Sequence, residues 1–268
     1  MGQPDPQTGG HPTSDAQVRL IARLDIKGSN LIKGIHLEGL RRVGSPVDFA
    51  LKYYEEGIDE LLFMDVVASL YGRSQLLEIV QATARNVFVP LTVGGGVRSV
   101  ENFEDLLRNG ADKVALNTAV INHPPLLSQL ASRFGSQAVV VSVEAQQIAP
   151  GRWEALTDNG RERTGRDVLE WVVQATQMGA GEVLVTSVDR EGTRSGFDTD
   201  LVSRVTTLVR TPVIASGGMG SAVDFVHLTQ TADVSGIAMA DVLHFKRLSI
   251  SEIRKVASAA GVRVRDYE

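Results

Sequence analysis

Short apolar runs alternate with longer amphipathic segments from about residue 18 to the end of the chain. The apolar runs, each the length of one β-strand, are Val18–Ile26, Glu60–Val66, Val89–Val93, Lys113–Leu116, Ala138–Val143, Glu182–Thr186, Pro212–Ala215 and Val234–Met239. The intervening segments have helical length and are Pro46–Glu56, Gln75–Ala84, Val100–Arg108, Leu126–Phe134, Val168–Met178, Leu201–Val209, Ala222–Thr229 and Ser251–Ala260. Cap-type residues precede several of them, as at Ser45 and Ser99. Glycine follows others, as at Gly57 and Gly110.

Strands this apolar, separated by helices, are typical of a parallel sheet buried on both faces. Eight such units favour closure into a (β/α)8 TIM barrel, an α/β fold of about 250 residues. A doubly wound open sheet stays the alternative, because alternation alone does not prove closure. We expect a single barrel domain over residues 18–268. Residues 1–17 are rich in Pro, Gly, Ser, Thr and Asp, and we expect them to form a disordered tail.

An internal repeat strengthens the barrel interpretation. The first strand ends at Asp25 and the fifth at Glu144, and glycine stretches follow 70 and 73 residues later, around Gly95 and Gly217. The pairs Asn117-Thr118 and Ala240-Asp241 follow these glycines by 22 and 23 residues. Three markers that recur in the same order favour two half-barrels related by duplication over chance agreement.

Composition excludes several classes of function. The chain has no cysteine, and its five histidines do not lie at metal-ligand spacing, so we expect no thiolate chemistry and no metal site. A net charge of −5 without a basic block makes nucleic acid an unfavourable partner. Neither a membrane span nor a signal peptide is recognisable, so a cytoplasmic protein is expected. The residues call for no cofactor.

Polar residues at the ends of the strands are the best candidates for chemistry, since active sites of this fold lie at the C-terminal face of the barrel. Asp25 and Glu144 are a candidate general acid and general base, provided that their surroundings separate their pKa values. The alternative is that each is a strand-end carboxylate that caps a helix or pairs with Lys33. Their symmetric placement favours catalysis for Asp25, whereas both interpretations stay open for Glu144.

The glycine stretches could bring backbone N–H groups close to an anion, although glycine also serves tight turns. Their positions after the third and seventh strands suggest two phosphate sites on opposite sides of one opening, and therefore an elongated bisphosphate substrate. The remaining candidate substrate contacts follow other strands, and a solvated turn is the alternative for the loop after the sixth strand. The candidate binding residues are Lys33, Gly96, Asn117, Thr118, Thr186, Glu191, Gly192, Ser216, Gly217, Gly218, Ala240 and Asp241.

Seven segments resemble the cyclase subunit of imidazole glycerol phosphate synthase: RLIARLDIKG (19–28), DELLFMDVVAS (59–69), VGGGV (93–97), GADKVALNTA (110–119), FGSQAVVVSVEA (134–145), GAGEVLVTSVDREGTRSGFD (179–198) and IASGGMG (214–220). The resemblance implies a lyase and cyclase step of histidine biosynthesis. Ammonia from a glutaminase partner would react with a phosphoribulosyl-formimino aminoimidazole carboxamide ribotide. The products would be imidazole glycerol phosphate and aminoimidazole carboxamide ribotide.

Carried over residue by residue, the resemblance makes Asp25 a catalytic acid or base and Lys33 a loop lysine above the opening. It places Gly96, Asn117 and Thr118 in one phosphate site, and Gly218 and Ala240 in the other. It also implies an ammonia gate at the N-terminal face, made by Arg19, Glu60, Lys113 and Glu182. The glutaminase would dock at that face, where Asp112 matches a partner-facing residue. A stabilising ring of ion pairs is the alternative interpretation of the gate.

The chain departs from this family at the substrate end. Glu144 stands where a catalytic aspartate is expected, Gln146 replaces a lysine, and Glu191 replaces an aspartate. Asp241 replaces a serine, and a carboxylate beside a bound phosphate is repulsive. Gly28-Ser29-Asn30 replaces an Asp-Gly-Arg type of turn. Retained ammonia delivery with altered acceptor chemistry would fit these changes.

Three alternative functions therefore stay open. The first is a paralogue that delivers ammonia to a different acceptor, as in the amidation of sugars for surface polysaccharides. The second is a catalytically silent barrel that binds a partner. The third is a related isomerase of the same pathway, which the gate residues and the GADKVALNTA segment favour less than the cyclase.

Overall fold

The structure is a computed structural model that describes residues 17–66 and 70–267. The tail expected over residues 1–17 lies, apart from Gln17, outside the described residues. In the described part of the chain, no helix is both long enough and apolar enough to cross a membrane.

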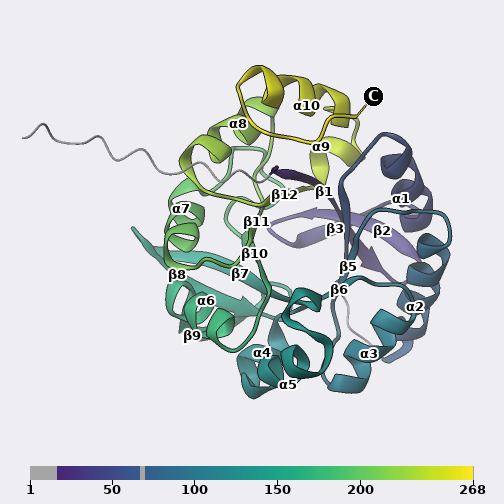
Figure 1. Cartoon of the computed structure of the whole chain (residues 1–268), viewed down its shortest axis with the longest axis vertical. Helices are drawn as coiled ribbons and strands as arrows, with labels where there is room; N and C mark the ends of the chain where they lie inside the picture. The colour runs from purple at the N-terminus through teal and green to yellow at the C-terminus, as the bar shows by residue number, and fades with distance from the viewer. Residues whose placement is uncertain (1–16, 67–69, 268) are drawn as a thin grey trace, which may run out of the picture.

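Parallel strands form a closed barrel at the centre of the molecule (Figure 1). Within the described residues, these strands are β1 (Arg19–Lys27), β4 (Glu60–Asp65), β5 (Leu91–Gly94), β6 (Lys113–Leu116), β7 (Val139–Ala149), β10 (Glu182–Ser187), β11 (Val213–Ser216) and β12 (Gly236–Met239). They pair in that order, β12 pairs with β1, and β10 pairs with β7. The predicted (β/α)8 barrel is therefore confirmed, and the open sheet is not formed.

Helices surround the barrel on its outside (Figure 1). The longer ones are α1 (Pro46–Glu55), α2 (Leu70–Ala84), α3 (Val100–Arg108), α5 (Pro125–Phe134), α6 (Val168–Gln177), α7 (Thr199–Leu208), α8 (Ala222–Thr231) and α10 (Ile250–Ala259). At several helix N-termini, a side chain accepts a hydrogen bond from a backbone N–H that would otherwise be unpaired, as Ser45 and Ser99 do. Ser221 forms a capping box with Asp224. The strand and helix positions agree with the sequence prediction to within a few residues, except that α2 begins at Leu70 and β7 ends at Ala149.

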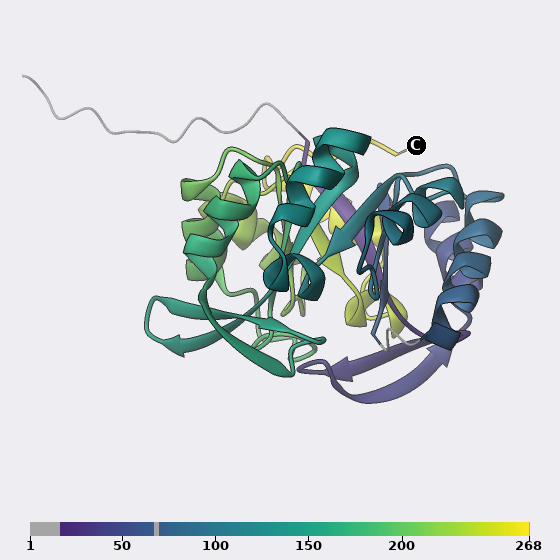
Figure 2. The ribbon, with the colours of Figure 1, turned by 90° about the horizontal axis from the view of Figure 1, so that it is seen from below.

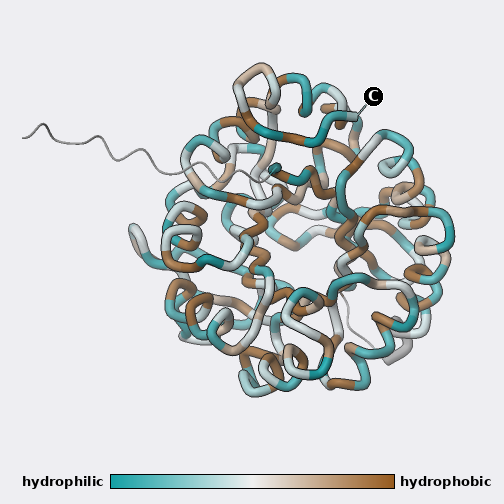
Figure 3. Tube along the Cα trace, in the orientation of Figure 1, coloured by the Kyte–Doolittle hydropathy of each residue, from teal (hydrophilic) through white to brown (hydrophobic). Residues whose placement is uncertain are grey.

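The two faces of each strand serve different layers of the core. On β1, Leu20, Ala22 and Leu24 belong to the outer core between the strands and the helices, whereas Ile21 lies inside the barrel. The inner cluster consists of Ile21, Leu62, Met64, Ala115, Val140, Leu184, Ile214 and Ala238. Brown, hydrophobic stretches along the strands and the inner sides of the helices trace both layers (Figure 3). An apolar layer therefore separates the two ends of the barrel interior.

Two antiparallel ribbons extend the barrel at the C-terminal ends of its strands, and the sequence pattern does not predict them. The first is β2 (Asn30–Ile35) with β3 (Glu38–Gly44), and the second joins the end of β7 to β8 (Arg152–Thr157) and β9 (Glu162–Asp167). Consequently β7 continues to Ala149, beyond the predicted end at Val143. Both ribbons lie along the same edge of the molecule (Figure 2). The short helices α4 (Thr118–Asn122) and α9 (Asp241–His244) and a 3-10 turn at Ser136–Ala138 are also additional.

Candidate active site

Asp25 and Glu144 lie on opposite sides of one opening, which we call the mouth: the end of the barrel where the parallel strands finish. They belong to β1 and β7, and three strands separate β1 from β7 in each direction around the barrel. Both side chains are buried, with 4% and 5% of the residue surface exposed. The mouth therefore contains two carboxyl groups that are shielded from water.

Arg23 forms a buried ion pair with Asp25. Its guanidinium Nε donates to Asp25 Oδ1 at 2.9 Å. Burial alone raises the pKa of a carboxyl, but the Arg23 guanidinium and the Lys33 ammonium overcome this effect and hold the pKa of Asp25 below its usual value. Asp25 is therefore an anion at neutral pH.

Glu144 has surroundings of a different kind. Its Oε2 accepts hydrogen bonds from the Gly160 backbone N–H at 2.6 Å and from Asn117 Nδ2 at 3.1 Å. Burial raises the pKa of Glu144 to about 7, against the opposing influence of Arg23. The two carboxyl groups thus differ in their protonation near neutral pH, which is the arrangement expected of groups with separate acid–base roles.

A cavity of about 640 Å³ opens beside Glu144, at the ends of β5 and β6. Gly95 and Gly96 line it with φ values of +100° and +65°, which only glycine adopts easily. A Cβ on Gly95 would lie 2.2 Å from the Asp65 carbonyl oxygen, so this turn excludes a side chain. Thr118 and Asn117 complete the wall near Glu144. The structure thus brings the first predicted phosphate site and Glu144 together.

Two buried polar atoms on this cavity wall lack partners. Among the described residues, Asn117 Oδ1 and Asn159 Nδ2 are buried without a hydrogen bond. Both residues line the 640 Å³ cavity. An unpaired buried polar group is costly, so these two atoms make the wall less stable than a fully hydrogen-bonded one.

The second glycine turn, after β11, is much more closed. Its cavity measures about 20 Å³, and the residues that line it are Arg23, Lys33, Glu191, Gly192, Ser216, Gly217, Gly218, Met219, Ala238, Met239, Ala240 and Asp241. The Lys33 ammonium and the Glu191 carboxylate form a buried ion pair across it. Asp241 Oδ1 accepts from Arg247 Nε at 2.8 Å. In this half of the mouth, the cationic side chains that could bind a phosphate are paired with carboxylates of the protein.

The β2–β3 ribbon closes over this second half. The His36 backbone N–H donates to the Glu191 carbonyl at 2.9 Å, and the His36 Nδ1 atom lies 2.8 Å from the Val188 carbonyl. Gly192 packs so closely that an added Cβ would lie 2.7 Å from the Gly34 carbonyl oxygen. The ribbon is thus attached to the loop between β10 and α7 by its backbone as well as by Lys33.

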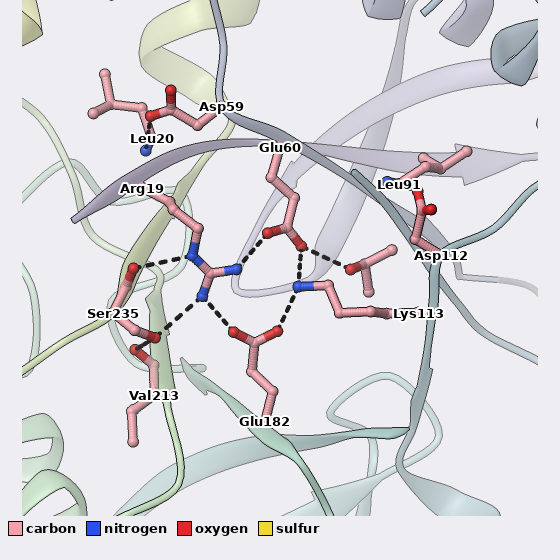
Figure 4. A network of polar contacts seen from close by, with 11 residues as sticks. Arg19, Leu20, Asp59, Glu60, Leu91, Asp112, Lys113, Glu182, Val213 and Ser235 are labelled. Atoms are coloured by element: carbon pink, nitrogen blue, oxygen red, sulfur yellow. Dashed lines mark hydrogen bonds and ion pairs between the residues drawn. The ribbon is translucent and has the colours of Figure 1, made fainter. Parts of the chain in front are cut away.

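The opposite end of the barrel carries the four charged residues predicted as an ammonia gate, and we call them the gate ring (Figure 4). Arg19 bonds to Glu60 and Glu182, and Lys113 contacts the same carboxylates at 2.7 and 2.6 Å. Each residue is the first of its strand, so the gate ring lies at the N-terminal end of the barrel. In the gate ring, cations and carboxylates alternate, and each cation contacts both carboxylates.

Neighbouring side chains hold the gate ring in position. Thr92 Oγ1 donates to Glu60 at 2.8 Å. Arg19 donates its Nε to the Ser235 carbonyl and its Nη2 to the Ser235 hydroxyl, both at 3.1 Å (Figure 4). Arg19 is consequently fixed by four acceptor groups, whereas Lys113 forms its ion pairs with two carboxylates.

Thr186 and Ser216 are buried and face Arg23. Their hydroxyl oxygens accept from Arg23 Nη1 at 3.0 and 3.2 Å. Arg23 itself is a site residue that the sequence reasoning missed. The available signal was a charged residue inside an apolar strand, two positions before Asp25, which alternation places on the same face of β1.

His244, to which we assign no role from the sequence, is a core residue that packs against Phe49 and Tyr53. It lies buried beneath the mouth, and its Nδ1 atom is 2.7 Å from the Tyr53 hydroxyl. Burial lowers the pKa of His244 to about 4, so the imidazole is neutral. Among the described residues, no His, Asp or Glu side chains gather in threes as metal ligands would.

Comparison with known proteins gives the family of this chain. A family model described as "Histidine biosynthesis protein" matches residues 19–249. A subunit from Legionella pneumophila named "Imidazole glycerol phosphate synthase subunit HisF" is 62% identical over 210 residues, which is 78% of this chain and 99% of the relative. Proteins of the same name from Mycobacteroides abscessus and Streptococcus sanguinis are 46% and 44% identical over 92% of this chain and 98% of their own lengths.

The family match and the identities extend over most of the barrel, including both of its ends. The gate ring and the mouth therefore lie within the compared region. The chain belongs to the histidine biosynthesis protein family, and it resembles the HisF subunits of imidazole glycerol phosphate synthase.

Proposed function

We propose that this chain is the cyclase subunit of an imidazole glycerol phosphate synthase and acts in histidine biosynthesis. In this lyase reaction, ammonia reacts with a phosphoribulosyl-formimino aminoimidazole carboxamide ribotide. Imidazole glycerol phosphate and aminoimidazole carboxamide ribotide are the products. The observation that carries the proposal is the pairing of a charged gate ring at one end of the barrel with a carboxyl-lined mouth at the other.

The interior of the barrel suits the passage of ammonia. Between the gate ring and the mouth lies the apolar inner cluster, which includes Ile21, Leu62 and Ile214. Neutral ammonia crosses apolar surroundings at less cost than ammonium, because a charge is expensive to remove from water. Ammonia that enters at Lys113 and leaves at the mouth would meet Glu144 and the acceptor. A glutaminase subunit docked at the N-terminal face would supply it.

The larger cavity is the proposed seat of one phosphate and of the reacting part of the substrate. The N–H groups of the turn at Gly96, together with Asn117 and Thr118, would bind the phosphate. Glu144 lines the same cavity and would transfer protons there. Asp25 would stabilise positive charge that develops during the reaction. The second glycine turn, at Gly218, would open for the other phosphate.

Turnover with an ammonium salt tests the proposal directly. The purified chain should consume the ribulosyl substrate in the presence of ammonium and without any partner. The absorbance of the substrate should therefore fall with time. Asp25→Asn should abolish this turnover while the protein stays folded. Asp200→Asn, an exposed carboxylate on α7, is the matched control and should retain it. Full activity of Asp25→Asn would refute the assignment of that residue.

The docking face requires its own test. With a glutaminase subunit present, glutamine should replace ammonium as the nitrogen source. A charge reversal at exposed Asp233, just before β12 at the N-terminal face, should weaken partner binding. Lys27→Glu, at the mouth end of β1, should leave it unchanged. The opposite result would place the partner at the mouth.

A second candidate function is ammonia delivery to a different acceptor, such as a sugar derivative. The closed second half of the mouth favours it, because Glu191 and Asp241 place carboxylates where a second phosphate would bind. Glutamine hydrolysis stimulated in the complex, without any consumption of the ribulosyl substrate, would support this candidate over the first.

A further inference from the structure

We infer that Arg23 is a positioning residue of the mouth: its guanidinium fixes Asp25 as a permanent anion and leaves Glu144 as the carboxyl group that exchanges protons with ammonia and the acceptor. This inference rests on the proposed use of ammonia at the mouth. It assigns separate roles to the two carboxyl groups and gives the physical cause of the separation.

The position of Arg23 follows from the alternation of β1. Arg19 lies in the gate ring, Ile21 in the apolar inner cluster, and Asp25 at the mouth, so Arg23 occupies the layer between Ile21 and Asp25. Only 2% of its surface is exposed. A charged side chain directly above an apolar layer and below the mouth lies on the path proposed for ammonia.

Hydrogen bonds from three strands hold the guanidinium in place. Arg23 Nε bonds to Asp25 of its own strand, and Nη1 donates to Thr186 of β10 and to Ser216 of β11. Thr186 and Ser216 are paired in register, so their hydroxyl groups form one acceptor surface for the guanidinium. A planar guanidinium held at this number of points keeps Asp25 in one position.

The charges around Asp25 keep it ionised. The groups that face it are Arg23 on β1, Lys33 on β2 and His244 on α9. Lys33 is already paired with Glu191, and His244 is neutral because its pKa is lowered to about 4 by burial. Arg23 is consequently the cation that is bonded directly to Asp25.

Among the described residues, Glu144 has no ion pair like that of Asp25 with Arg23. Its acceptor contacts are to the Gly160 N–H and the Asn117 amide, and the charged groups that influence it are Arg23, Asp25 and Asp158. Its carboxyl lies at the wall of the 640 Å³ cavity. With a pKa of about 7, it can both accept and donate a proton near neutral pH.

Glu144 would accept one proton and donate one proton in each turnover. When ammonia forms a bond to an electrophilic carbon, its nitrogen becomes positively charged and must lose a proton. The ionised carboxylate of Glu144 accepts that proton, and the resulting carboxyl donates it to the group that leaves. Asp25, which stays charged throughout, stabilises the transient positive charge.

Titration of the carboxyl groups by ¹³C NMR tests the inference without any substrate. In the intact chain with labelled Asp and Glu carboxyls, the Asp25 signal should not titrate between about pH 5 and 9, whereas the Glu144 signal should change near pH 7. Asp25→Asn and Glu144→Gln assign the two signals. In Arg23→Met, the Asp25 signal should titrate within the measured range. Arg23→Lys keeps the cation and should restore the flat profile.

Kinetics give the second readout, measured at a constant concentration of free ammonia. Arg23→Met should lower kcat by roughly a hundredfold, the effect expected when a reacting group is displaced by about 1 Å. The acid side of its pH profile should become steeper, because two carboxyl groups must then lose protons. Arg152→Met, which removes an exposed arginine on β8, is the matched control and should retain the profile of the parent.

Thr186→Val replaces Arg23→Met if that variant does not fold. It removes one acceptor of the guanidinium and should shift the Asp25 titration in the same direction by a smaller amount. An Asp25 signal that titrates in the unchanged chain, or one that ignores Arg23→Met and Thr186→Val, would overturn the inference. If these titrations behave as expected but the ribulosyl substrate is not consumed, the role of Arg23 stands and the proposed reaction fails.

Discussion

Replacing Glu144 by glutamine should make the protein more stable relative to the parent as the pH rises. Burial raises the pKa of this carboxyl from its ordinary value of 4.5 to about 7. Below pH 4.5 the group is protonated in both the folded and the unfolded chain, so its contribution to stability is complete. Between these pH values the unfolded chain releases the proton and the folded chain keeps it, so the free energy of unfolding falls as pH rises.

The size of the effect follows from the same shift. One pKa unit corresponds to about 1.4 kcal/mol, so the parent should lose about 3 kcal/mol through this group between pH 4.5 and pH 8. Glutamine stays neutral and can accept the hydrogen bonds from Gly160 and Asn117 through its carbonyl oxygen. The variant should therefore gain about 3 kcal/mol over the parent across this range.

Urea unfolding of the parent and of Glu144→Gln at several pH values measures this difference. His244 has the opposite sign, because burial lowers its pKa to about 4 and stability is lost as pH falls. Subtracting the two curves removes the His244 contribution, which both proteins share. Glu162→Gln corrects for the removal of one exposed carboxyl. A difference that stays constant from pH 5 to pH 8 would refute the reasoning.

Four further outcomes are expected. His244→Phe should lose less stability than the parent between about pH 6.5 and pH 4, measured by urea unfolding, because a buried neutral imidazole no longer has to be protonated; parallel losses would contradict this. Asp241→Ser should tighten the binding of inorganic phosphate by about tenfold in calorimetry, since a carboxylate is removed from the second glycine turn; unchanged affinity would show that Asp241 does not oppose the anion. Lys113→Met should lower stability by about 3 kcal/mol in thermal unfolding, because two carboxylates of the gate ring lose a cation; an unchanged melting temperature would contradict it. Gly218→Ala should lower the free energy of unfolding by about 1–3 kcal/mol, because φ is +110° and an added Cβ would lie 2.2 Å from the Gly196 carbonyl oxygen. A melting temperature equal to that of the parent, measured by circular dichroism, would contradict this.

The alternation of apolar and amphipathic segments was sufficient to predict the strands and helices because it is a local property of the chain, whereas the pairing of β12 with β1 decided that the sheet closes. A strand such as Lys113–Leu116 is bounded at the same residues in the sequence and in the structure. The β2–β3 and β8–β9 ribbons were not predictable in this way. The strands of these ribbons are short and only partly apolar. Pairing with the ends of β1 and β7 stabilises them.

The candidate site divides along the same line. The placement of the gate residues at strand beginnings, and of Asp25 and Glu144 where the parallel pairing of β1 and β7 ends, follows from sequence position within each β–α unit. Their individual chemistry does not, since it depends on residues far apart along the chain. The Arg23 guanidinium reaches Thr186 and Ser216 only because β10 and β11 close the barrel.

By itself, the sequence determined the order of the strands and helices, and with it the placement of the gate residues at strand beginnings, because the apolar and amphipathic patterns that specify these elements are local properties of the chain. Only the tertiary structure decided that one half of the mouth is an open cavity of about 640 Å³ and that the other, of about 20 Å³, is closed by Lys33 and Glu191. It also decided that Asp25 is an anion while Glu144 has a pKa near 7. Burial and ion pairing depend on distances across the barrel, and no local pattern in the chain specifies those distances.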